Sequence, residues 1–331
     1  MTTPSRPGLI ITVTLSPALD VTYALPEGGG QDVDVFRASS STLEASGKGV
    51  NVSRALHSVG VPTCAVLPAG GPAGRCLAEL LDEEHVPHRI VAQDSSTRVN
   101  TTALRPGGET LKLNGPGATL TAGEQEALLD ATRRALEGAA ARVGETWVAV
   151  CGSLPRGTTA DVVTRLVELA HAHGGKCAVD ASGDALKAAL EARADLLAPN
   201  RGELADVVDD GLRAGGLLDL GQALRSLSAE TGSRLLVSVG REGALYTDGD
   251  DVLHGTAAPL TPVNTAGAGD ALLAGWLSTV ADRRSRLETA VRWGRSACLS
   301  VTTVDSRPGL RDTQAVTVSD LVTGKGQCRG R

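Results

Sequence analysis

A run of small residues that ends in a carboxylate is the chemically most distinctive feature of the sequence. The segment Asn264–Asp270 runs N-T-A-G-A-G-D and precedes an apolar stretch beginning at Ala271. Small residues let a ligand approach the backbone closely, and the first amides of a helix have no partner inside it. With the helix dipole added, the amides of Gly267, Ala268 and Gly269 favour binding of an anion such as a phosphoryl group.

Asp270 itself admits two interpretations. A carboxylate in the first turn of a helix complements the helix dipole, and this structural role alone would account for it. Alternatively, Asp270 is a general base that accepts the proton of a hydroxyl group as this group attacks phosphorus. The segment taken alone does not separate the two interpretations.

Two common nucleotide-binding motifs are absent from the sequence. Leu272 stands where the pattern G-x-G-x-x-G would need its third glycine. Gly49 follows Lys48 where a P-loop would need Ser or Thr, and Thr42 occupies the position of its first glycine. The sequence therefore disfavours a dinucleotide-binding fold and a P-loop fold.

The elements that must position these residues alternate between strands and helices. β-Branched apolar runs predict strands at 9–15, 63–67, 147–151, 176–179, 195–198 and 234–239. Apolar residues three and four apart predict helices at 50–59, 73–84, 121–142, 160–173, 184–193, 218–230, 269–280 and 287–303. This alternation predicts an α/β fold with a mostly parallel central sheet, helices on both faces and ligands beyond the carboxyl ends of the strands.

A second, smaller sheet is predicted from a segment that lacks this alternation. Short alternating stretches between 89 and 113 are joined by a Pro-Gly-Gly turn, which is typical of a hairpin. Segments 21–25 and 33–36 can supply its other strands. We therefore expect one α/β domain over 1–323, with a β lid from about 21–37 and 89–113, and a flexible basic tail at 324–331.

Composition and charge exclude several classes of partner. The formal net charge is −6, and the chain has only three Trp, two Tyr and one Phe, so a general nucleic-acid or anionic-membrane binder is disfavoured. Apolar runs fall short of the roughly 18 residues needed to span a bilayer. The six cysteines form no C-x-x-C pair and no signal peptide is evident, which predicts reduced thiols and a cytoplasmic location.

Several segments together resemble one known family. The segments 14–20 (TLSPALD), 47–52 (GKGVNV), 97–100 (TRVN) and 267–270 (GAGD) are supported by 152–155, 199–203 and 238–244. In this order they resemble the ribokinase-like, or phosphofructokinase B, carbohydrate kinases, and most closely the branch of 1-phosphofructokinases and tagatose-6-phosphate kinases. The resemblance implies a ribokinase-like fold whose small sheet closes over the sugar.

The resemblance also implies a role for individual residues. Asp270 corresponds to the catalytic base, and the amides of Gly267, Ala268 and Gly269 to the hole that receives the phosphoryl group. The sugar-contacting positions are Asp20, Gly47, Lys48 and Asn51, and Arg98 corresponds to an arginine that reaches the phosphate already on the substrate, which its guanidinium fork suits. The nucleotide-binding positions are Asn200, Glu203, Ser238, Gly240 and Gly243, and Glu203 helps to organise Mg²⁺ through water.

Three positions depart from the family pattern. Ser16 and Ser46 replace an asparagine and a glycine, and both changes can be absorbed by a hydroxyl group or a shifted turn. Ala198 stands where the branch usually has a lysine. The loss of this cation removes one positive charge near the nucleotide phosphates, so it bears directly on ATP binding.

The activity that the resemblance implies is ATP-dependent phosphorylation of a phosphorylated ketohexose, favouring fructose 1-phosphate to fructose 1,6-bisphosphate with Mg²⁺. Lys48 and Arg98 would hold the substrate phosphate, and Asp20 and Asn51 its hydroxyl groups. The alternatives are a kinase for tagatose 6-phosphate, a kinase for a neutral sugar or nucleoside, and a catalytically silent sugar-phosphate sensor. Lid strands with an exposed edge are also compatible with a homodimer, although a monomer with a covered edge fits equally well.

Overall fold

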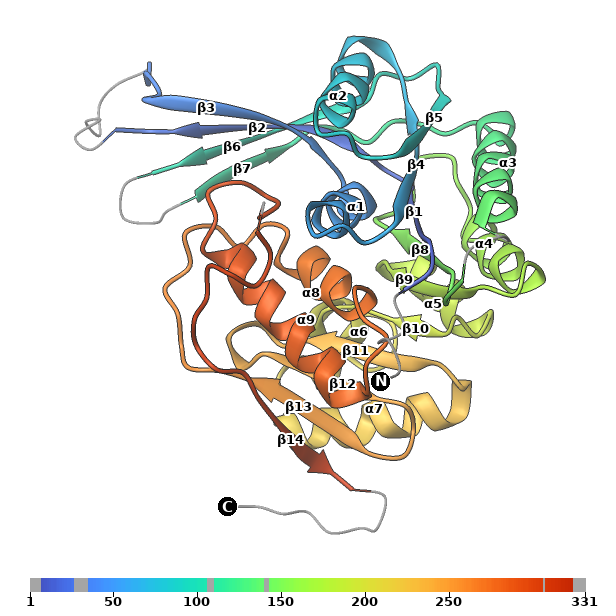
Figure 1. Ribbon diagram of the computed structural model, residues 1–331, viewed down its shortest axis with the longest axis vertical. Helices are drawn as coiled ribbons and strands as arrows, with labels where there is room; N and C mark the ends of the chain where they lie inside the picture. Colours follow the sequence, from blue (N-terminus) through green and yellow to red (C-terminus); the bar gives the residue numbers. More distant parts are fainter. Residues whose placement is uncertain (1–6, 27–34, 106–109, 140–142, 306, 324–331) are drawn as a thin grey trace.

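A computed structural model describes residues 7–26, 35–105, 110–139, 143–305 and 307–323. Within these residues the strands form a ten-stranded sheet in the order β14-β13-β12-β11-β10-β9-β8-β1-β4-β5 and a four-stranded sheet in the order β3-β2-β6-β7 (Figure 1). All neighbours from β5 to β11 are parallel, whereas β11 to β14 pair antiparallel. The strands of the large sheet are β1 Ile10–Thr14, β4 Thr63–Ala69, β5 His88–Ala92, β8 Trp147–Cys151, β9 Lys176–Asp180, β10 Leu196–Leu197, β11 Arg234–Ser238, β12 Ala244–Thr247, β13 Val252–Thr256 and β14 Thr317–Val322.

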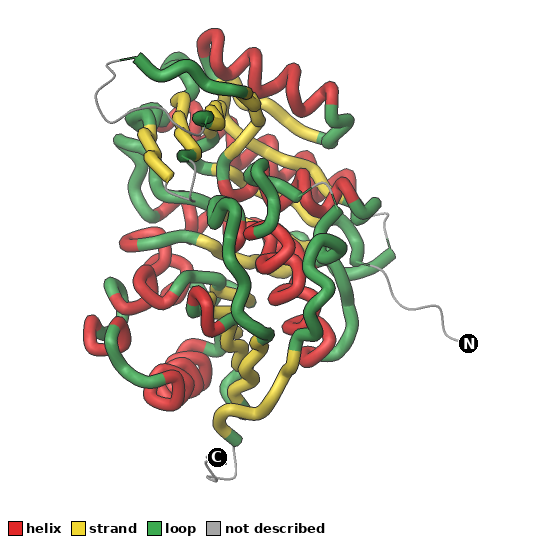
Figure 2. The backbone as a smooth tube through the Cα atoms, turned by 90° about the vertical axis from the view of Figure 1, so that its left-hand side faces the viewer, coloured by secondary structure: helices red, strands yellow, loops and turns green. Residues whose placement is uncertain are grey.

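The central strand β1 shows why helices cover both faces of the large sheet. Every residue of β1 is buried, and its side chains alternate between two hydrophobic clusters. Ile11 and Val13 pack into the cluster that holds α3 Ala122–Ala139, α4 Asp161–Ala172, α5 Gly183–Glu191 and α7 Leu217–Thr231. Ile10 packs into the cluster that holds α1 Lys48–Ser58, α8 Ala268–Leu277 and α9 Arg283–Cys298. Figures 1 and 2 show these helices as layers on either side of the sheet, which confirms the predicted α/β fold.

Local signals place several helix ends as predicted. The backbone amide of Thr121 donates to Glu124 Oε2 at 2.7 Å and the amide of Glu124 donates to Thr121 Oγ1 at 3.3 Å, so the predicted capping box precedes α3. The last helix differs from its predicted range of 287–303. Asp282 caps the amides of Arg284 and Ser285, which starts α9 earlier, and α9 ends at Cys298 because residues 299–303 turn back toward α8.

The small sheet consists of β2 Ala18–Ala24, β3 Ser40–Ser46, β6 Arg98–Leu104 and β7 Thr110–Asn114, and it projects from the main body (Figure 1). Its strands differ in part from the predicted lid segments of about 21–37 and 89–113. β3 lies beyond residue 37, and the sequence did not predict it because its Ser- and Thr-rich segment has no apolar alternation. Val35 and Phe36 are outside any strand, and residues 27–34 lie outside the described residues.

The segment at the start of the second predicted lid range belongs to the large sheet. β5 pairs in parallel with β4, and Val91 of β5 is buried in the main core. This burial explains why the segment joins the edge of the large sheet and not the lid. Another strand that the sequence did not predict is β14, which pairs antiparallel with β13. The predicted tail 324–331 lies outside the described residues.

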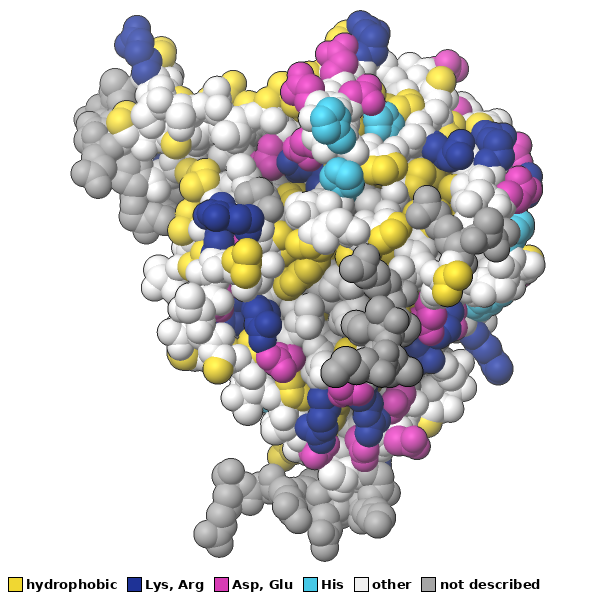
Figure 3. Space-filling view, in the orientation of Figure 1, with side chains coloured by type: hydrophobic (Ala, Val, Ile, Leu, Met, Phe, Trp, Pro, Cys, Tyr) yellow, Lys and Arg dark blue, Asp and Glu magenta, His cyan; other side chains and the backbone are white. Residues whose placement is uncertain are grey.

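Charges on the face shown in Figure 3 are interspersed, with basic and acidic side chains beside each other. Ion pairs of this kind join Arg283 to Asp248 and Arg284 to Asp320. The cysteines in the described part of the chain, Cys64, Cys76, Cys151, Cys177 and Cys298, are all free thiols. In that same part, none of the helices combines the length and the apolar character that crossing a bilayer requires.

Candidate active site

The start of α8 has the open backbone that the sequence predicted. Gly267 caps the helix in the left-handed region with a φ of 76°, and a Cβ at this position would lie 2.2 Å from the carbonyl oxygen of Thr303. A side chain here would be strained and would clash, so the turn requires glycine. A Cβ at Gly269 would meet no described atom within 4 Å, so the first turn of α8 is open on that side. The amides of this turn are available to an anion.

Asp270 lies at the centre of the site and is only 7 % exposed. Its Oδ2 accepts a hydrogen bond of 2.7 Å from Asn51 Nδ2 of α1. Burial, reinforced by the charge of Asp180, raises the pKa of Asp270 to about 7, although the Asn51 hydrogen bond and the charge of Lys48 act in the opposite direction. A carboxyl group with such a pKa exchanges protons readily near neutral pH, as a general base must.

The burial of Asp270 also bears on its alternative, purely structural interpretation. A carboxylate that only complements a helix dipole gains nothing from burial, which penalises its charged form. Asn51 Oδ1 is itself buried and has no partner among the described residues. A buried acceptor without a donor, beside a raised carboxyl pKa, favours a site built for a hydroxyl-bearing ligand.

Lys48 is held between two carboxylates. It follows Gly47, whose φ of 119° and close approach to Thr14 leave no room for a side chain. Lys48 Nζ lies 2.7 Å from Asp180 Oδ1 and 3.3 Å from Glu203 Oε1. Burial alone would lower the pKa of Lys48, but these charges outweigh it and raise the pKa, so the ammonium stays charged. Its contacts are with Asp180 and Glu203. That Lys48 also holds the substrate phosphate together with Arg98 stays a prediction.

Sequence reasoning missed Asp180, which ends β9 and is 3 % exposed. Burial raises the pKa of Asp180, while the ammonium of Lys48 lowers it. A signal for this residue was present in the sequence, because Asp180 directly follows the buried run Cys177-Ala178-Val179. Polar residues at that point of a parallel strand face the ligand edge of the sheet.

The lid side of the site is formed by β2 and β6. Asn100 Nδ2 donates to Asp20 Oδ1 at 2.8 Å, and strand register places these two residues opposite each other. Arg98 Nη2 donates to the carbonyl oxygen of Ser16 at 3.0 Å, whereas its buried Nε has no partner in the described part of the chain. Burial lowers the pKa of Arg98, which the charge of Asp20 partly offsets. Such a partly desolvated guanidinium can bind an anionic group of a ligand.

The predicted nucleotide-binding residues lie together at the carboxyl ends of β10 and β11. Asn200 and Glu203 form a capping box at the start of α6 Arg201–Ala205, with hydrogen bonds of 2.9 and 2.8 Å. An isolated parallel bridge joins Asn200 to Ser238. Gly240 and Gly243 form the turn that follows, both with positive φ, and a Cβ at Gly243 would lie 2.0 Å from a backbone oxygen.

Ala198, in contrast, is partly buried against the apolar cluster that contains α8 and α9. It presents no charge to the site. The structure does place another positive charge beside the predicted nucleotide-binding residues, because the ammonium of Lys48 contacts Glu203.

The fold and the site place a buried acid, the open first turn of a helix and the polar face of the small sheet near the carboxyl edge of a parallel sheet. A hydroxyl group and a phosphoryl donor can meet there away from water, so the class that these parts define is a phosphotransferase acting on an alcohol group. The family model "pfkB family carbohydrate kinase" matches residues 18–313. The chain therefore belongs to the PfkB family of carbohydrate kinases.

Known relatives of similar length support this assignment. A protein named 1-phosphofructokinase from Haloferax volcanii is 33 % identical over 317 residues, which cover 96 % of each chain. The ATP-dependent 6-phosphofructokinase isozyme 2 of Escherichia coli is 32 % identical over 291 residues, covering 87 % of this chain and 90 % of that protein. The crystal structure of phosphofructokinase-2 from Escherichia coli in complex with fructose-6-phosphate superposes with a TM-score of 0.77 at 29 % identity, covering 88 % and 94 % of the two chains.

Proposed function

We propose that this enzyme transfers the γ-phosphoryl group of ATP to a phosphorylated ketohexose, with fructose 1-phosphate as the favoured acceptor and fructose 1,6-bisphosphate as its product. The observation that carries the proposal is Arg98, whose partly unpaired guanidinium lies beside Asp20 in a site that also contains the buried Asp270. A neutral sugar would leave this guanidinium without an anion. Relatives named for fructose phosphates support the same substrate class.

Asp270 acts as the general base in this proposal. The hydrogen bond from Asn51 fixes the carboxylate so that its other oxygen accepts the proton of the attacking hydroxyl group. The amides of Gly267, Ala268 and Gly269 receive the charge of the transferred phosphoryl group. Catalysis then consists of positioning and charge neutralisation, with little covalent chemistry for the protein to perform.

The substrate is held from both sides of the site. Asp20 and Asn51 contact its hydroxyl groups, and the glycine backbone at Gly47 allows it to approach closely. Arg98 binds the existing phosphate, while Lys48 lies between the sugar and the donor phosphates, where it screens their mutual repulsion. The lid sheet closes over the sugar and excludes water, whose attack on ATP is the competing reaction.

The nucleotide lies along Asn200, Ser238, Gly240 and Gly243 in this proposal. Mg²⁺ fits the site only through water, because Glu203 Oε2 already accepts from the Asn200 amide and Oε1 already contacts Lys48. In the described part of the chain no group of three ligating side chains gathers to hold a metal directly. Bound in this way, Mg²⁺ would supply charge neutralisation for the ATP phosphates.

A panel of phosphosugars assayed with ATP and Mg²⁺ tests the proposal through coupled release of ADP. We expect the highest kcat/KM with fructose 1-phosphate. A preference for tagatose 6-phosphate or for fructose 6-phosphate would keep the mechanism and change the acceptor, and a preference for a neutral sugar would remove Arg98 from phosphate binding. Binding of sugar phosphates without release of ADP would identify a sensor instead of an enzyme. We also propose a cytoplasmic location, which the free thiols of the described cysteines support.

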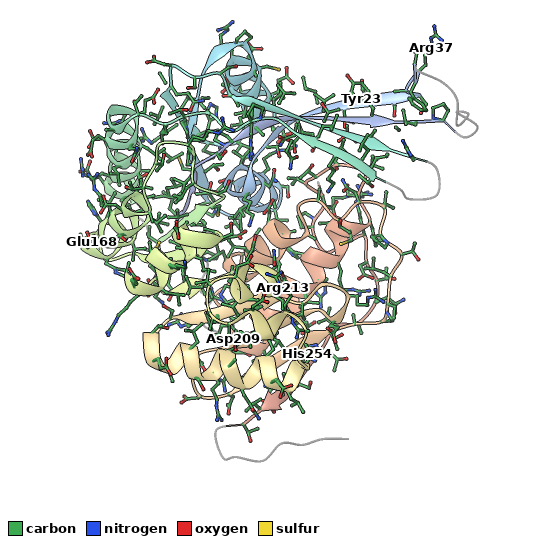
Figure 4. All side chains as sticks on the ribbon, turned by 180° about the vertical axis from the view of Figure 1, so that it is seen from behind. Tyr23, Arg37, Glu168, Asp209, Arg213 and His254 are labelled. Atoms are coloured by element: carbon green, nitrogen blue, oxygen red, sulfur yellow. The ribbon has the colours of Figure 1, made fainter. Side chains whose placement is uncertain are left out.

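We also propose a homodimer through the lid. The lid face that carries Asp20 is polar, whereas Tyr23, Leu43, Leu111 and Leu113 on the opposite face are 40, 43, 49 and 60 % exposed. Figure 4 shows Tyr23 on the projecting sheet. Such an apolar face is suited to a second copy of itself. Light scattering of the wild type and of Leu113→Asp tests this proposal. We expect a dimeric wild type and a monomeric variant, and a monomeric wild type would contradict the proposal.

A further inference from the structure

Glu44 is a buried carboxylate that has no part in the proposed phosphoryl transfer. It lies on the lid strand β3 and is 5 % exposed. Its Oε1 accepts from Arg54 Nη1 at 3.3 Å, and its Oε2 accepts from the backbone amide of Thr303 at 3.1 Å. Glu44 therefore joins the lid to a segment far away in the sequence.

Glu44 contacts the segment 298–303, and this segment packs against the turn that precedes α8. The carbonyl oxygen of Thr303 lies so close to Gly267 that a Cβ there would be 2.2 Å away. Cys298 O accepts from the amide of Val263 at 2.8 Å, and Val301 O accepts from Asn264 Nδ2 at 3.2 Å. The position of the turn before α8 thus depends on residues 298–303, and Thr303 is the point of closest approach.

Strand register connects the same carboxylate to the sugar side of the site. Glu44 lies directly opposite Asp20 in the antiparallel pair of β3 and β2, so both side chains are on the polar face of the lid. Gly267, Asp270, Asn51 and Thr303 also line one small hollow. A displacement of the β2–β3 pair therefore changes the position of Asp20 and of the Thr303 amide together.

Arg54 explains how a carboxylate can be buried at this position. Its Nε and Nη2 donate to both oxygens of Glu84 at 2.7 and 2.6 Å, and its Nη1 also donates to Ala45 O at 3.0 Å. Arg54 is therefore anchored mainly through Glu84. Glu44 keeps one oxygen for Thr303, because Arg54 needs only the other.

We propose that Glu44 is a positioning residue for phosphoryl transfer, which sets the anion-binding turn at Gly267 through the amide of Thr303 and couples it to the lid strands that hold the sugar. The proposal rests on the proposed kinase function, because the turn is where that function places the transferred group. Glu44 touches neither substrate in this proposal, so its loss should change the rate of the bound complex much more than the affinity for either substrate.

The test compares Glu44→Ala with the matched control Glu84→Gln, which weakens the anchoring of Arg54 but leaves the contact between Glu44 and Thr303 intact. We expect kcat of Glu44→Ala to fall by about 10- to 100-fold, the effect of a small misplacement of reacting groups, with both KM values within about threefold of wild type. Glu84→Gln should retain kcat within about twofold. An unchanged kcat in Glu44→Ala, or an equal loss in the control, would overturn the proposal.

Amide hydrogen exchange supplies a readout that does not depend on activity. Exchange of peptides covering 264–272 and 299–305 should accelerate in Glu44→Ala and stay at the wild-type rate in Glu84→Gln, and equal exchange in all three proteins would also overturn the proposal. Absence of turnover by the wild type would instead refute the proposed function. If Glu44→Ala does not fold, Glu44→Gln replaces it. Arg54 and the Thr303 amide donate to different oxygens of Glu44, and glutamine offers an oxygen to only one of these two positions. The kcat and the hydrogen exchange of Glu44→Gln should then shift in the same directions as expected for Glu44→Ala.

Discussion

The substitution Asp270→Asn separates the two interpretations of this residue because it should change activity and stability in opposite directions. Asparagine keeps the shape of the side chain and an oxygen that can accept from Asn51 Nδ2, but it cannot take up a proton. A general base contributes roughly 10²- to 10⁴-fold, so we expect kcat to fall by about that factor while KM for the sugar phosphate stays close to wild type.

The gain in stability follows from the pKa of Asp270. This pKa is about 7 in the folded protein, against an ordinary value of 3.8. Since the folded-state pKa is the higher one, the fold favours the neutral acid, and this contribution is lost as the pH rises from about 4 to about 7. Above pH 7 the folded wild type bears a penalty of up to about 4 kcal/mol that the variant does not have.

Thermal unfolding measures this penalty. A chain of this length has an unfolding entropy of about 0.7 kcal/mol/K, so Tm of Asp270→Asn should exceed that of wild type by up to about 6 °C at pH 8. The difference should shrink at pH 5.5. A variant with near-normal kcat would remove Asp270 from the role of base, and a lower Tm at pH 8 would show that the buried carboxylate is stabilising, contrary to the reasoning above.

Three further outcomes are expected. Arg98→Ala should raise KM for a phosphosugar by about 10- to 100-fold and much less for its unphosphorylated analogue, and equal effects on both would indicate a kinase for neutral sugars. Gly267→Ala should lower both Tm and kcat, because the added Cβ meets Thr303. Gly269→Ala should keep Tm and raise KM for ATP, because its Cβ enters the open side of α8. Similar losses of Tm in both variants would contradict this open side. The kcat/KM of the wild type should rise with pH and level off above about 7, and a flat profile from pH 5.5 to 8 would contradict the raised pKa of Asp270.

The central strands of the large sheet and the helices that cover them could be predicted from the sequence, because these strands are apolar and these helices are amphipathic. The fully buried run at β8 and the capping box at Thr121 illustrate signals that are purely local. β3 and β14 escaped prediction for the opposite reason. Both are edge strands with many exposed polar residues, and only pairing with β2 or β13 makes them strands.

The candidate site shows the same division. Asp270, Asn51 and Lys48 stand in glycine-rich segments whose spacing carries information, and the structure brings them together. Asp180 and Glu44 stand in segments without a motif, and each acquires its role from a contact more than a hundred residues away in the sequence. Long-range contacts of this kind are set by tertiary packing, which a single sequence does not display.

The most direct test of the central claim is a crystal structure with a non-hydrolysable ATP analogue and the preferred sugar phosphate bound together. We predict that the γ-phosphate lies against the amides of Gly267, Ala268 and Gly269, with the acceptor hydroxyl group within hydrogen-bonding distance of Asp270. A γ-phosphate directed away from this turn, or a sugar whose free primary hydroxyl group faces Glu203 and not Asp270, would contradict the account.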